Sequence, residues 1–132
     1  MRGIGVPLVL SIVVLAGLVL TGPAVIADGA DEIDIQVSPG VISLASKAEW
    51  VTVHADIPYS QVAGITVTLN GVGVEFTKSD DRGYLVAKFN SGDVKDILEV
   101  GMVDLVLSGE TWAGTPFTGT DTIKVIDVTG KK

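Results

Sequence analysis

Residues 51–57 have the sequence Val-Thr-Val-His-Ala-Asp-Ile, in which apolar and polar side chains alternate without a break. Successive side chains of a β-strand point to opposite faces of the sheet, so this alternation predicts a strand with one buried face. The pattern recurs along the chain in runs rich in valine, isoleucine and threonine, whose branched side chains favour strands over helices. The further runs are residues 33–37, 65–69, 85–89, 103–108 and 122–125.

Residues typical of turns separate these runs. The turns are expected at Ser38-Pro39-Gly40, Asn70-Gly71, residues 80–83 and residues 108–114. The Asn-Gly pair in particular suits a tight hairpin with positive φ at both positions. Two shorter strands are expected at residues 41–45 and 72–77. The chain after residue 27 is therefore predicted to be all-β, a sandwich of seven or eight antiparallel strands.

One segment departs from the strand pattern. Residues 91–98 begin with Ser91 as a candidate N-cap and continue with apolar residues at helical spacing. We expect one short helix here, ended by Gly101, with Ile97 and Leu98 covering one end of the sandwich.

The first 27 residues differ in composition from the rest. A single basic residue, Arg2, precedes an almost wholly apolar run, and Gly22-Pro23 breaks that run shortly before Ala27. This order is typical of a secretory signal peptide. We therefore predict a signal peptide at residues 1–27, with cleavage after Ala27, and a secreted domain at residues 28–132.

Two alternatives to a cleaved signal remain open. Residues 4–20 form a run near the short limit for a membrane-spanning helix, so an uncleaved anchor is possible on length alone. The Arg2-Gly3 pair before an apolar stretch is also similar to the processing site of pilin-like proteins, although Leu8 stands where those proteins usually carry a glutamate. All three interpretations place the remaining chain outside the cytoplasm, at the cell surface or beyond it.

Charge and composition narrow the class of function. The chain has 16 acidic and 9 basic residues, and Arg2 is the only basic residue before position 28, so the later domain carries 8. Nucleic-acid binding needs clustered basic residues and is not expected. The absence of cysteine and the single histidine, His54, exclude a disulfide scaffold and a two-histidine zinc site within one chain. With no catalytic motif present, we predict a protein that is not an enzyme and needs no cofactor.

Residues 33–127 resemble the secreted immunoglobulin-like β-sandwich modules of bacterial and archaeal extracellular proteins, some of which stand beside dockerin modules. The stretches that carry the resemblance are IDIQVSPGVISLASKAEWVTVHADIP (33–58), ITVTLNGV (65–72), LVAKFNSGDVKDILEVGMVDLVLSG (85–109) and GTPFTGTDTIKVID (114–127). The resemblance implies an immunoglobulin-like fold, and because its motifs are structural it supports fold better than function. Related modules often carry an aspartate-rich, calcium-loop-like turn before the strand that corresponds to Leu85–Phe89. Here that turn is shorter, which leaves Asp80 and Asp81 as weak calcium candidates.

The candidate partner-binding residues lie in the last hairpin. Trp112 stands at its tip between Thr111 and Ala113, and Thr115 follows. A tryptophan at a hairpin tip either folds back over the sandwich or is presented to a partner, as in modules that stack aromatic rings on sugars. The second tryptophan, Trp50, is expected in the core. His54 is expected on an exposed strand face beside Asp56.

Unpaired strand edges offer a second way to bind. The stretch 115–122 and the acidic segment 28–34 are candidates for pairing with another chain. The alternative is a protected edge, with Gly119 and Asp121 disrupting such pairing.

These observations predict a non-enzymatic extracellular structural, adhesion or protein-interaction module. Its expected partners are other extracellular proteins or cell-surface polymers, with self-association possible through edge strands and membrane contact only through residues 4–20 if they are retained. Two alternatives are kept: a pilin-like surface-filament subunit with a retained N-terminal segment, and a carbohydrate-binding module that uses Trp112.

Overall fold

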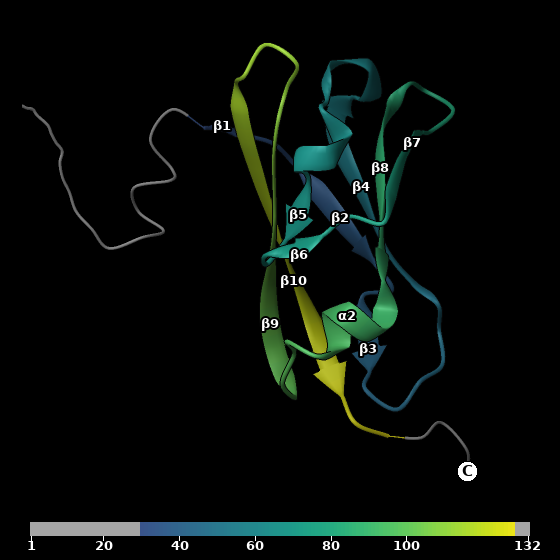
Figure 1. The fold of residues 1–132 in the computed structure, drawn as a ribbon. Coiled ribbons are helices and arrows are strands. Elements are labelled where there is room, and N and C mark those ends of the chain that lie inside the picture. The colour runs from purple at the N-terminus through teal and green to yellow at the C-terminus, as the bar shows by residue number, and fades with distance from the viewer. Residues whose placement is uncertain (1–29, 129–132) are drawn as a thin grey trace, which may run out of the picture. The chain divides into compact units, whose positions relative to one another are not determined.

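A computed structural model describes residues 30–128, which form two β-sheets packed face to face (Figure 1). The elements are β1 (Asp31–Glu32), β2 (Ile35–Ser38), β3 (Val41–Ser43), β4 (Trp50–Pro58), the 3₁₀ turns η1 (Tyr59–Gln61) and η2 (Gly64–Thr66), β5 (Thr68–Leu69), β6 (Val72–Gly73), β7 (Phe76–Ser79), β8 (Tyr84–Asn90), helix α2 (Ser91–Lys95), β9 (Gly101–Glu110) and β10 (Pro116–Ile126). The predicted signal peptide, anchor and pilin-like helix lie outside the described residues. Within residues 30–128, no helix has the length and apolar character needed to cross a membrane.

Two sheets make up the sandwich. Sheet A has the strand order β1-β10-β9-β5-β6, with β3 also paired to β10, and sheet B has the order β2-β4-β8-β7. The predicted all-β sandwich with one short helix is confirmed. The prediction that all strands are antiparallel is wrong for two pairs, because β1 and β3 both run parallel to β10. The first strands of the chain therefore pair with the last one.

The N-terminal part of the described chain changes sheet twice. It adds β1 to sheet A, crosses to sheet B as β2, and returns to sheet A as β3. During the crossing, the Ile33 N–H donates to the Thr118 carbonyl at 2.9 Å, and the Val37 N–H donates to Asp121 Oδ2 at 2.8 Å. The Asp121 carboxylate thus accepts a hydrogen bond on the side of β10 away from β9, between the stretches that pair with β1 and β3. Of the two alternatives for residues 115–122, a free edge or a protected one, the structure has the protected edge, because β1 and the Asp121 carboxylate cover it.

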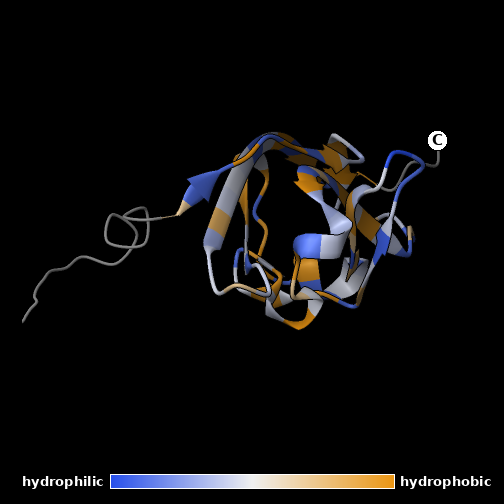
Figure 2. Ribbon diagram, turned by 90° about the horizontal axis from the view of Figure 1, so that it is seen from above, coloured by the Kyte–Doolittle hydropathy of each residue, from blue (hydrophilic) through white to orange (hydrophobic). Residues whose placement is uncertain are grey.

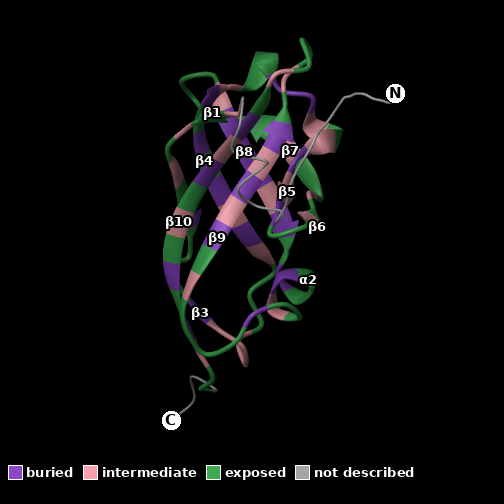
Figure 3. Cartoon of the chain, turned by 90° about the vertical axis from the view of Figure 1, so that its left-hand side faces the viewer, coloured by how far each residue is buried: buried purple, intermediate pink, exposed green. Residues whose placement is uncertain are grey.

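The buried core lies between the sheets, and its members come from the predicted alternation. Val51, Val53 and Ala55 of β4 are buried, with Val51 and Val53 no more than 1% exposed. His54, which lies between Val53 and Ala55, faces outward. Figure 3 shows the same alternation of buried and accessible residues along β9 and β10. Seen from above, the strands of both sheets surround this core (Figure 2). The largest fully buried side chains are Phe89, Phe117, Leu69, Leu85, Leu105, Leu107 and Ile123.

The strand predicted at residues 65–69 is wrong in its first half. Residues 64–66 form the 3₁₀ turn η2, and Ile65 is 93% exposed instead of buried. The Thr66 hydroxyl explains the departure, because it donates to the Ala63 carbonyl at 2.7 Å and accepts from the Glu110 N–H at 2.8 Å. A side chain that satisfies backbone groups in this way competes with the regular strand ladder.

The single strand predicted at residues 72–77 is two strands in different sheets. The Val74 N–H donates to Val67 at the end of η2, whereas the next N–H, of Glu75, donates to Lys88 in sheet B. The chain thus passes from one sheet to the other between these two residues. This crossing joins β6 to β7, which are the last strands of the two sheet orders given above. The β1–β3 segment lies at the opposite ends of both sheets, so the two crossings are on opposite sides of the sandwich.

The short helix is confirmed, but three details of its prediction are wrong. Asn90, not Ser91, is the N-cap, because its side chain accepts from the Asp93 N–H at 3.1 Å. The helix ends before Gly101, which begins β9 instead. Leu98 is 7% exposed and packs in the core, whereas Ile97 is 46% exposed, so only the former covers this end of the sandwich.

Trp50 is not a core residue. It lies on the outer face of sheet B, where its indole packs edge-on against the Phe76 ring with centroids 5.4 Å apart. By contrast, the Asn70-Gly71 turn has positive φ at both residues, 46° and 86°, as predicted.

Candidate binding site

A pocket of about 550 Å³ lies beside the β9–β10 hairpin. The tip of this hairpin is at the upper end of the sandwich in Figure 1. The pocket brings together the three residues predicted from the sequence, Trp112, Thr111 and Thr115. The other residues that line it are Asp31 and Ile33 from the N-terminal segment, Ile57 at the end of β4, Ser60 and Gln61 of η1, Ala113, and Phe117. Phe117 and Ile57 are at most 7% exposed, so the inner part of the pocket belongs to the core.

Hydrogen bonds fix the backbone of the hairpin tip. The Thr111 N–H donates to the Thr115 carbonyl at 2.9 Å, and the Thr115 N–H donates back to Thr111 Oγ1 at 3.1 Å. The left-handed conformation of Gly114, with φ of 87°, closes the turn. The Trp112 N–H donates to the Gln61 carbonyl at 2.9 Å, which ties the tip to η1. The position of the tryptophan is thus set by both neighbouring segments.

The Trp112 side chain is 73% exposed. Of the two arrangements left open by the sequence, the structure has the presented one, and the indole does not fold back over the sandwich. A large aromatic side chain held in place but accessible to solvent is the usual anchor of a binding surface. The contribution of η1 and of Asp31 to this site could not be found from the hairpin sequence, because both come from distant segments.

The weak calcium candidates Asp80 and Asp81 lie in the turn between β7 and β8. Asp80 Oδ1 accepts from the N–H groups of Arg82 and Tyr84 at 2.8 and 2.9 Å, so its carboxylate already organises the turn. The Tyr84 N–H is the main reason that the pKa of Asp80 lies below its usual value of 3.8, and the N–H and charge of Arg82 act in the same direction while desolvation opposes them. In the described part of the chain, no three histidine, aspartate or glutamate side chains are grouped to hold a metal ion.

We expect Asp80→Asn to lower the melting temperature at pH 7, because a neutral amide accepts the two N–H groups more weakly than a carboxylate. A carboxyl whose folded pKa is lowered stabilises the fold above its unfolded pKa, and this stabilisation is lost as the pH falls through the folded value. The difference between wild type and variant should therefore shrink below about pH 3.8. Thermal melts between neutral and acidic pH measure it.

Asp81→Asn is the matched control for this prediction, since it makes the same charge change one residue away. A constant difference between wild type and Asp80→Asn at all pH values would show that the carboxylate has no such role. Equal changes in melting temperature for Asp80→Asn and Asp81→Asn would also show that the Asp80 carboxylate has no special role in the turn.

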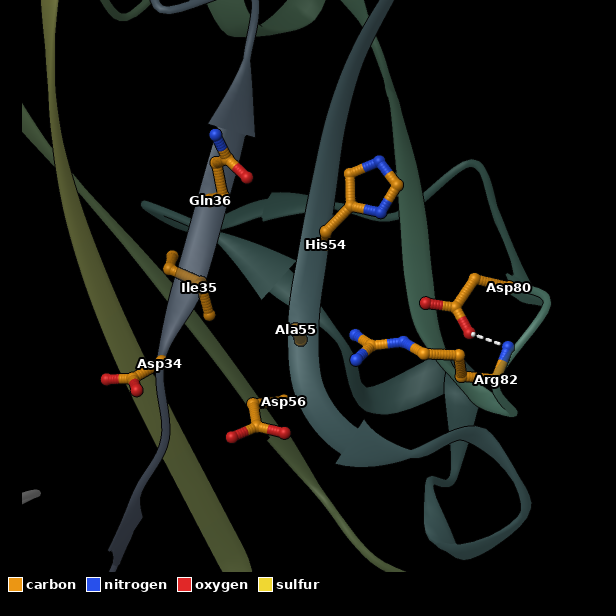
Figure 4. A pocket seen from close by; sticks show the side chains of 8 residues that line it. All are labelled: Asp34, Ile35, Gln36, His54, Ala55, Asp56, Asp80 and Arg82. Atoms are coloured by element: carbon orange, nitrogen blue, oxygen red, sulfur yellow. Dashed lines mark hydrogen bonds between the residues drawn. The ribbon is translucent and has the colours of Figure 1, made fainter.

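A second hollow lies on the outer face of sheet B, around His54 (Figure 4). Gln36 stands opposite His54 in the β2–β4 register, Asp56 follows on the same face of β4, and Arg82 reaches in from the β7–β8 turn. The sequence placed His54 and Asp56 on one exposed face, and the structure agrees. The sequence did not predict that Gln36 of β2 and Arg82 of the turn lie beside His54, because strand register is set by tertiary pairing. No hydrogen bond between His54 and a carboxylate is present in residues 30–128, so the arrangement of a Ser-His-Asp relay is not formed there.

No family model matches the chain, and no curated protein matches it. A solved structure similar to it is a bacterial immunoglobulin-like domain from the M. primoryensis ice-binding adhesin. The two are 24% identical, with a TM-score of 0.43, and the similarity covers 75% of this chain and 99% of the other.

Proposed function

We propose that the chain is a non-enzymatic extracellular module of immunoglobulin-like type that binds a partner through the end of the sandwich around Trp112. The observation that carries the proposal is an indole 73% exposed on a hairpin tip whose backbone is fixed by hydrogen bonds on both sides. Because the backbone of the tip is already ordered, binding costs little entropy of loop ordering, and this cost does not reduce the affinity gained by covering the apolar ring.

Export is part of this proposal. Its support is the order of residues 1–27, a basic start followed by an apolar run and a Gly-Pro break. Mass spectrometry of the protein recovered from the producing cells tests it. A first residue of Asp28 supports a cleaved signal peptide, Met1 supports a retained anchor, and Ile4 supports pilin-like processing.

We expect Trp112→Ala to reduce binding of the protein to the cell walls of the producing organism by at least tenfold. A tryptophan that becomes buried when a partner binds contributes about 2 kcal/mol or more to the binding free energy. About 1.4 kcal/mol corresponds to a tenfold change in Kd. Co-sedimentation with purified cell walls measures it. Trp50→Ala is the matched control, because it removes the same side chain from the outer face of sheet B. Equal retention of wild type and Trp112→Ala, together with unchanged self-association of the variant, would contradict the proposal.

A carbohydrate ligand is the second candidate for this site. The observation that favours it is the position of Ser60, Gln61 and Asp31 beside the exposed indole. Sugar-binding sites combine such polar side chains with an aromatic ring that stacks on the sugar. Fragments of cellulose, xylan or chitin should then change the fluorescence of the protein, and the change should be absent in Trp112→Ala. Unchanged fluorescence with all three would remove this candidate.

A further inference from the structure

A group of apolar side chains is exposed at the end of the sandwich opposite to Trp112. Val41 of β3, Lys124 of β10 and Met102 of β9 form one row across the outer face of sheet A, because Lys124 pairs with each of the other two. Val41 is 50% exposed and Met102 is 69% exposed. Val100, just before β9, and Val128, just after β10, are 63% and 54% exposed. We call these four apolar residues, with the lysine between them, the Met102 patch.

The patch is unusual for the outer face of its own sheet. Farther along β9 and β10 the same face carries the pairs Asp104–Thr122, Val106–Thr120 and Ser108–Thr118, in which Val106 is the only apolar residue and is half-buried. Thr122 Oγ1 donates to Asp104 Oδ1 at 2.6 Å, so polar groups there bond to one another. Isolated exposed apolar residues are common, but four of them at one end of a sheet are a candidate contact surface.

The pocket at the opposite end has the complementary properties. Its wall is apolar, through Ile33, Ile57, Phe117 and Trp112, and the exposed carboxylate of Asp31 lies at its rim. The patch offers unbranched Met102, which adapts to an irregular pocket, beside the positive charge of Lys124. An apolar pocket with an aspartate in its lining thus lies at one end of the module, and exposed apolar side chains around Lys124 lie near the other.

These two surfaces cannot meet within one molecule. β1 begins beside Phe117 at one end of β10, whereas the row of Val41, Lys124 and Met102 lies near the other end of that strand. We propose that the partner of the Trp112 end is a second copy of this chain, whose Met102 patch docks in the pocket with Lys124 near Asp31. This inference rests on the proposed function and names its partner.

Such a contact has a direct consequence for assembly. Each molecule keeps a free patch at one end and a free pocket at the other, so the contact does not close on itself as a two-fold interface would. Unless a ring forms, copies add head to tail. Head-to-tail assembly of this kind does not use the edge strands that the sequence suggested for self-association.

The test uses the protein expressed from its complete coding sequence and purified in the form that the cell produces. Sedimentation velocity up to about 1 mM, where contacts of millimolar Kd become populated, should show a mass that grows beyond a dimer. Trp112→Ala removes the aromatic wall of the pocket, and Met102→Glu places a negative charge in the patch. Each variant alone should therefore stay monomeric. A mixture of the two should stop at a 1:1 heterodimer, because it retains a single intact pocket and a single intact patch.

Charge reversal of two exposed side chains provides an independent check. Asp31→Lys and Lys124→Asp should each weaken assembly, and a protein with both substitutions should recover it. A monomer at every concentration, a closed dimer, or a mixture that contains no heterodimer would overturn the inference. If the protein is monomeric and Trp112→Ala still loses binding to cell walls, the proposed function stands while the second copy is excluded as its partner.

Discussion

Phe89→Ala is expected to lower the free energy of unfolding by about 3–5 kcal/mol, the usual cost of removing a buried aromatic ring from a close-packed core. Phe89 is 0% exposed on β8 and pairs with Val51 of β4 in the centre of sheet B. A domain of this size has a total stability of about 5–15 kcal/mol, so the variant should lose a large part of it. Urea denaturation followed by tryptophan fluorescence measures the change.

Phe76→Ala is the matched control for this substitution. Phe76 lies on the neighbouring strand β7, but its side chain is 43% exposed and packs against Trp50 on the outer face. Its removal should cost about 1 kcal/mol, the value of an aromatic pair with modest burial. Equal losses for the two variants would mean that the core does not lie between the sheets as described.

Gly119→Ala is expected to destabilise the protein by about 1–3 kcal/mol, because an added methyl group overfills a packed site. A Cβ at this position would lie 2.6 Å from Ile35 Cγ2 and 2.7 Å from the Ile33 carbonyl oxygen. The second contact is with backbone, so the N-terminal segment would have to move away from β10. Hydrogen exchange should then show faster exchange of the Ile33 and Val37 amides.

Gly73→Ala is the control for this prediction. Gly73 also lies in a strand of sheet A, but an added Cβ meets no atom within 4 Å. The substitution should leave stability unchanged or raise it slightly, since alanine has less conformational freedom in the unfolded chain. The same loss in both variants would show that the close approach at Gly119 has no special cost.

The alternation in residues 51–57 was sufficient to predict a strand and its buried face, and the similar runs predicted a sandwich, although in residues 85–89 Val86 of the outer face is buried as well. It was sufficient because one-sided burial imposes a period of two whatever the neighbouring strand is. The pairing of strands is a different matter. β1 has only two residues, Asp31 and Glu32, both exposed, and its place beside β10 depends on a partner 86 positions later in the chain. No local pattern carries that information.

The failures at Ile65 and at residues 72–77 have a similar origin. The Thr66 hydroxyl and the Glu75 N–H bond to residues of other strands, and those bonds override an alternation that is locally convincing. At the candidate site, the sequence placed Trp112 at a hairpin tip because turn residues flank it. The backbone of that tip is fixed in part by Gln61, through a carbonyl that any residue could have supplied, so the sequence does not reveal this contact.

The parallel pairing of β1 with β10 determines how the module would respond to a force that pulls on its two ends. Asp31 is paired with Phe117 at the start of β10, while the described chain leaves the module beyond Ile126 at the far end of that strand. Tension applied along the polypeptide therefore slides the two strands past each other and strains all of their hydrogen bonds together, instead of unzipping them in succession. β3, also parallel to β10, shares the strain. Resistance to force depends on the rate of unfolding, and this arrangement places the barrier between the first and last strands of the module.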